Sequence, residues 1–250
     1  METTELVKAT AALREMMGLA EDPLAFFYSD RQPQGHLPSA EGRSCVIGVL
    51  TRARRGETVF YDKEHVACRG GAYYLGFAPP SPDVEYFVST GIPGKMAGEH
   101  YKKSPELVKA AMQQAAVQPA PARYAVFKPV SALARDEEPA VVICFASADQ
   151  LSGLVALAGY ARAEEGVICP FSSGCGAIVA LPLAEARRER PRAVLGMFDP
   201  SARPFVGKDE LSFAAPVAMW AEMLENAGES FLTTKTWSRI RERMEEEAPR

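Results

Sequence analysis

The sequence lacks the motifs that identify the common hydrolases and nucleotide-binding proteins. It contains no G-x-S-x-G nucleophile motif, no Walker A lysine loop and no G-x-G-x-x-G following an expected strand. Only three histidines occur among the 250 residues, which argues against a histidine-rich hydrolytic zinc site. These absences exclude the reactions that a single sequence identifies most readily.

Long apolar runs and an excess of positive charge are also absent. No stretch approaches the roughly 18 apolar residues that span a bilayer, and the N-terminus lacks the basic start and apolar core of a signal peptide. The formal net charge is −4, which argues against a nucleic-acid binder. The short basic run at 52–55 is expected to form a solvated face. We therefore expect a cytoplasmic protein that binds neither membranes nor nucleic acid.

The remaining pattern predicts an α+β fold. Helical and strand-like segments are mixed without a regular βαβ rhythm, which favours a mixed, largely antiparallel sheet with packed helices. A helix is expected over 44–55, with Ser44 as its N-cap, and strands over 58–61, 73–77 and 140–145. We predict one domain over residues 1–250, with a weak internal boundary in the proline-rich link at 118–122.

The chemistry of the chain is most clearly indicated by its five cysteines. Structural disulfides are not expected in the cytoplasm. Cys144 lies inside a predicted buried strand, where a cysteine behaves as a small hydrophobic residue. Cys45 opens a predicted helix, whose dipole lowers the pKa of a thiol. The other three cysteines lie in two glycine loops, at 68–71 and 169–176.

Cysteine beside glycine favours a thiolate site, because glycine lets backbone N–H groups approach a bound atom. We expect an iron–sulfur cluster or a zinc ion, with a redox role in the first case. The predicted metal ligands are Cys45, Cys68, Cys169 and Cys175, and the N–H groups predicted to donate to their sulfurs belong to Gly70, Gly71, Gly174 and Gly176. The spacing matches neither C-x2-C pairs nor common ferredoxins, so convergence of these cysteines cannot be read from the sequence.

Two other functions are compatible with the same residues. The glycine loops, Lys95, Arg203 and nearby aromatics would line the pocket of a metal-free small-molecule binding protein. Alternatively, Cys169 and Cys175 would form a reversible disulfide in a thiol redox protein. His65 is either a ligand or base beside Cys68 or a turn histidine, and the segment 199–205 either faces a pocket or forms a turn. The substrate, the redox partner and the subunit number stay open, and a homo-oligomer is compatible with the sequence.

Several of these segments resemble one known family. The stretches 56–77, 169–176, 209–213 and 230–237 are similar to the uncharacterised ArCR family, a domain of unknown function. The resemblance implies a single full-length domain but no established activity, cofactor or substrate. It also implies that the family's cysteine positions are occupied by Cys45, Cys68, Cys169 and Cys175, with Cys144 as an additional cysteine.

Overall fold

The computed structural model describes residues 1–41, 44–115 and 117–247. Seven strands of this described part form one sheet in the order β2-β3-β1-β4-β7-β6-β5. The strands are β1 (Leu24–Ser29), β2 (Val59–Tyr61), β3 (Tyr124–Pro129), β4 (Val141–Ala146), β5 (Val167–Ile168), β6 (Ala193–Gly196) and β7 (Leu211–Pro216). Neighbouring strands pair antiparallel, except β5 and β6, which pair in parallel. The predicted α+β class with a mixed, largely antiparallel sheet is therefore confirmed.

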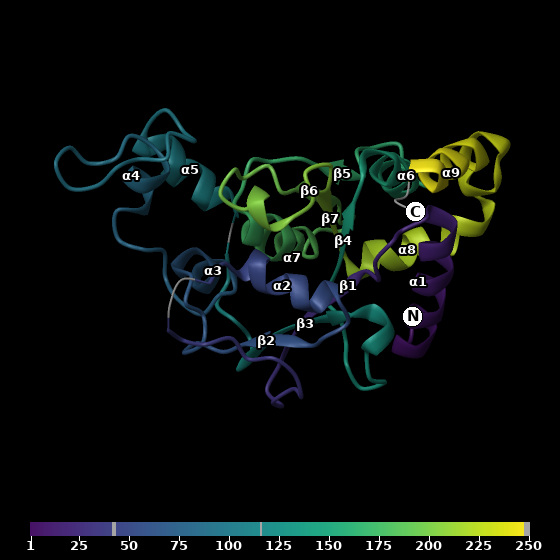
Figure 1. Cartoon of the computed structure of the whole chain (residues 1–250), viewed down its shortest axis with the longest axis horizontal. Coiled ribbons are helices and arrows are strands. Elements are labelled where there is room, and N and C mark those ends of the chain that lie inside the picture. Colours follow the sequence, from purple (N-terminus) through teal and green to yellow (C-terminus); the bar gives the residue numbers. More distant parts are fainter. Residues whose placement is uncertain (42–43, 116, 248–250) are drawn as a thin grey trace.

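Helices cover both faces of this sheet (Figure 1). The α-helices are α1 (Thr3–Met17), α2 (Val46–Arg54), α3 (Arg69–Tyr74), α4 (Val84–Val88), α5 (Pro105–Ala115), α6 (Ala148–Ala158), α7 (Leu181–Glu185), α8 (Val217–Asn226) and α9 (Lys235–Glu247). A π-helical turn at Gly176–Ala180 runs directly into α7. None of the helices in the described ranges is long and apolar enough to cross a membrane.

The alternation of side chains along β4 divides the core into two layers. Val142 and Cys144 pack into the layer that contains α1, α6, α8 and the start of α9, whereas Val141 and Ile143 pack into the layer that contains α2 and the π-helical turn. This is the period of two expected when a strand is buried on both faces. Cys144 is 2 % exposed, and this strand geometry turns it away from the face on which Cys175 lies.

One predicted strand is wrong. The stretch 73–77 was expected to be extended because it is rich in aromatic residues, but its first part belongs to α3. The helix begins at Cys68, whose sulfur accepts the N–H of Gly71, and it ends at Gly76, whose φ of +74° favours glycine. Leu75 becomes fully buried in this arrangement, so tertiary packing overrides the local β preference.

A small lobe separates α3 from β3. It contains α4 and α5, and it stands away from the sheet at the left of Figure 1. Its exit through the proline-rich link is fixed to the body, because the N–H of Ala120 donates to the carbonyl of Gly76 at 2.9 Å. The lobe also reaches the second cysteine loop, where the rings of Tyr101 and Phe171 lie 5.7 Å apart.

Candidate functional site: three cysteines around a buried tyrosine

Three of the predicted cysteines stand at the start of helical segments. Cys45 is the N-cap of α2, Cys68 is the N-cap of α3, and Cys175 precedes the π-helical turn. Cys45, rather than the predicted Ser44, holds the cap position of its helix. At such positions unpaired backbone N–H groups point toward the side chain and favour a thiolate. The sulfur of Cys68 accepts the N–H of Gly71 at 3.4 Å.

Glycines allow these helix starts to approach one another. A methyl group placed on Gly71 would lie 2.6 Å from Cγ2 of Val46, the first residue of α2. A methyl group on Gly174 would lie 2.8 Å from Cγ1 of Ile47, the next residue of the same helix. Both distances are too short for real carbon atoms, so only glycine fits at either position. The first and second cysteine loops therefore both pack against the start of α2.

The ionisation of the thiols shows that they face a common region. Burial is the main cause that raises the pKa of Cys175 well above its usual value, and the neighbouring Cys68, Cys45 and Asp199 raise it further. Burial also raises the pKa of Cys45, against the opposing effect of the Gly48 and Ile47 N–H groups. Like charges at this site oppose one another. Three thiolates and a carboxylate would be stable together only with a neutralising cation.

Tyr61, the last residue of β2, points its phenol toward the same region. Its side chain is 1 % exposed, and within the described part of the chain its hydroxyl group has no hydrogen-bond partner. Burial raises the pKa of this phenol, and Cys175, Cys45 and Cys68 raise it further. A buried hydroxyl without a partner costs about 1–3 kcal/mol. Sequence reasoning missed this residue because nothing distinguishes it from an ordinary strand tyrosine.

Asp199 anchors the second cysteine loop from the far side. It follows β6, is 7 % exposed, and accepts the N–H of Gly174 at 3.3 Å. The N–H and hydroxyl of Ser201 donate to its other oxygen at 2.9 and 2.8 Å. Of the two residues singled out in 199–205, Asp199 thus faces the site. Arg203 instead turns to backbone carbonyls at the end of its own loop, including that of Gly207 at 2.9 Å.

The fourth predicted ligand, Cys169, lies apart from this group. It is exposed, whereas Cys175 is buried and Cys45 and Cys68 are partly buried. Two residues further along, the ring of Phe171 contacts Tyr101 and carries the ammonium group of Lys102 at 5.6 Å from its centroid. The structure therefore brings three of the four predicted cysteines together. It leaves the fourth on the surface, beside the lobe.

The predicted glycine donors have varied partners. Gly71 donates to Cys68 as expected, but Gly174 donates to Asp199 and Gly176 donates to the hydroxyl of Ser173 at 3.1 Å. Gly70 is exposed, and a methyl group there would lie 3.9 Å from the sulfur of Cys68. Most of these glycines thus shape the loops around the thiols.

His65 belongs to a turn next to the site. Its Nδ1 lies 2.7 Å from Oδ1 of Asp62, which also accepts the His65 backbone N–H. The same hydrogen bonds lower the pKa of Asp62. This is the turn histidine that the sequence left as one of its alternatives.

The thiols are close, but they do not form a site for a single metal ion. Across the described ranges, no three Cys, His, Asp or Glu side chains form a group that could hold one. Four bonds of about 2.3 Å to a tetrahedral zinc would place its sulfur ligands about 3.8 Å apart. The observed spacing does not meet this requirement.

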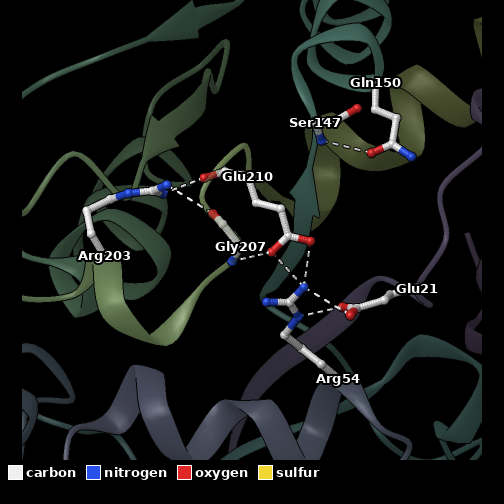
Figure 2. A network of polar contacts seen from close by, with 7 residues as sticks. All are labelled: Glu21, Arg54, Ser147, Gln150, Arg203, Gly207 and Glu210. Carbon is white, nitrogen blue, oxygen red and sulfur yellow. Dashed lines mark hydrogen bonds and ion pairs between the residues drawn. The ribbon is translucent and has the colours of Figure 1, made fainter. Parts of the chain in front are cut away.

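An ion-pair network fixes the far end of α2 (Figure 2). Arg54 lies between the carboxylates of Glu21 and Glu210, at 2.8 Å from the latter, and its guanidinium stacks 4.5 Å from the ring centroid of Phe145. Its side chain is only 11 % exposed. The expectation that the basic run is a solvated face is thus wrong for Arg54, because two acids far away in the sequence meet it. The network positions the helix that carries Cys45 at its other end.

Comparison with known proteins gives one result. The model of the uncharacterised ArCR family, domain of unknown function 169, matches residues 12–226. The chain belongs to this family. No curated protein and no solved structure matches it.

Proposed function

We propose that this chain is a cytoplasmic iron–sulfur protein with a redox role, whose cluster is bound by Cys45, Cys68 and Cys175. The observation that carries this proposal is the gathering of three helix-capping thiols around the buried, unpartnered hydroxyl of Tyr61. Cysteine thiolates are the ligands that iron–sulfur clusters use.

The charge of the site supports a bound cation. Each of the three thiols is held near the others and near Asp199, and burial alone opposes their ionisation. Metal coordination deprotonates a thiol and offsets this cost. The backbone N–H of Gly71 beside Cys68 would tune such a cluster, since hydrogen bonds to the sulfurs shift its reduction potential.

The spacing favours a cluster over zinc. A zinc ion draws all of its ligands to one centre. In a cluster each cysteine binds a different iron, so the ligand sulfurs lie farther apart. Thiols that influence one another without forming a single-ion group agree with the second arrangement.

The test is the composition of anaerobically purified protein. We expect a brown protein with iron and acid-labile sulfide in equal amounts, about four of each per chain for a cubane cluster. The single replacements Cys45→Ala, Cys68→Ala and Cys175→Ala should each remove most of the iron. Cys144→Ala is the matched control, because Cys144 is equally buried but packs in the other layer.

Circular dichroism of each variant separates loss of iron from loss of fold. Colourless protein with one zinc per chain would contradict the cluster and indicate a structural site. Colourless, metal-free protein from anaerobic cells would instead favour small-molecule binding, to be followed by thermal stabilisation with candidate ligands.

A further inference from the structure

We infer that the cluster is attached through three irons only, and that its fourth iron faces Tyr61 and is open to a small ligand that accepts a hydrogen bond. This inference rests on the proposed function. It assigns Cys169, the remaining loop cysteine, to the surface and not to the cluster.

The burial of the loop cysteines separates three ligands from one free thiol. Cys175 is 6 % exposed within the apolar layer, with Cys45 packed against the same cluster. Cys169 is exposed on the other end of its loop. The segment between them is fixed by specific contacts: Gly176 donates to Ser173, and Phe171 packs on Tyr101. These contacts hold the loop with Cys169 outward and Cys175 inward.

Tyr61 supplies the second, independent observation. A phenol that is 1 % exposed and has no partner among the described residues is expected only where a ligand accepts its hydrogen bond. A phenol donates one hydrogen, and the three thiols around it are occupied when they bind iron. The acceptor must therefore be a group outside the chain, such as an oxygen or nitrogen atom bound at the open iron.

The test compares the wild type with Cys169→Ser and Tyr61→Phe, each reconstituted anaerobically with iron and sulfide. We expect all three to bind the same amount of iron and to keep the same circular dichroism spectrum. On treatment with ferricyanide, one electron passes to the oxidant and one ferrous ion leaves the cluster. Wild type and Cys169→Ser should then both give the electron paramagnetic resonance signal of a three-iron cluster.

Cyanide serves as the probe of the open position. In dithionite-reduced protein it should shift the resonance signal of the wild type and of Cys169→Ser at the same concentrations. Tyr61→Phe should need about tenfold more cyanide, as expected for the loss of one hydrogen bond to a charged ligand.

Three results would be decisive against these proposals. Loss of iron in Cys169→Ser would overturn the inference while leaving the cluster itself in place. A signal unchanged by cyanide in the wild type would overturn the open position. Wild-type protein that binds no iron at all would instead overturn the proposed function.

Discussion

At the scale of single residues, the spacing between the two glycines after Cys68 has a clear purpose. Gly71 faces Val46 across the site, whereas Gly70 faces solvent. The first contact fixes how closely α3 approaches α2, and thereby how closely Cys68 approaches Cys45.

Gly71→Ala should lower the free energy of unfolding by about 1–3 kcal/mol, because its methyl group would overlap the side chain of Val46. Gly70→Ala is the control, and should be neutral or stabilising by up to about 1 kcal/mol, since alanine favours a helix more than glycine does. Urea denaturation of both variants measures the difference. Equal midpoints would show that the two helices approach each other less closely than described.

Residue-level prediction from the sequence succeeded for the types of residue and failed for their geometry. The capping position of Cys45 and the burial of Cys144 follow from local pattern, and both were expected. The orphaned hydroxyl of Tyr61 depends on three segments that meet only in the folded chain. The outward position of Cys169 likewise depends on contacts with a distant lobe.

At the scale of elements, α2 is held at both ends by different chemistry. Its first turn carries a thiol, and its last turn carries the guanidinium of Arg54 between two acids. Neither acid is near α2 in the sequence, so the pattern of the basic run could not reveal the pairing. The strand forecast at 73–77 failed for a similar reason, since burial of Leu75 decided its conformation.

Arg54→Met should lower the free energy of unfolding by about 2–3 kcal/mol, because it leaves Glu21 and Glu210 without their partner. Arg52→Met should cost less than about 1 kcal/mol, since its pair with Glu57 is exposed. The measurement is chemical denaturation at low salt. Similar losses in the two variants would contradict a special role for Arg54.

A second ion pair predicts a pH dependence. Arg162, which is 1 % exposed, donates to Glu222 in α8 and thereby lowers the pKa of that carboxyl. The pair therefore stabilises the fold above the unfolded pKa of about 4.3, and this stabilisation is lost as the pH falls through the lower, folded value. Glu222→Gln should be less stable at neutral pH and should lose less stability on acidification. Thermal melts across the acid range measure both effects, and parallel curves would rule out this contribution.

At the scale of the whole molecule, one sheet serves two cores. Both tryptophans, Trp220 and Trp237, report on the layer that contains α1, α8 and α9. The cysteine site belongs to the opposite layer. Because the strands of the sheet are shared, the two layers should unfold together, as predicted for a single domain.

Urea unfolding of the iron-loaded protein tests this cooperativity. Tryptophan fluorescence and visible absorbance of the cluster should change at the same midpoint. Trp237→Phe keeps the reporter Trp220 while weakening the contact to Met16, and it should shift both midpoints equally. Loss of visible absorbance well before the change in fluorescence would indicate that the cysteine layer is a separate unit.

The order of the strands has a consequence for association. Both outermost strands are short: β2 has three residues and β5 has two. The free side of β2 is also occupied by His36, whose N–H and carbonyl bond to Thr58 and Phe60 at 2.8 and 3.0 Å. Short or covered edges prevent sheets of neighbouring molecules from joining into aggregates. A chain newly made, or one that has lost its metal, is therefore protected from edge-to-edge polymerisation, and any assembly of several copies must use helices or loops.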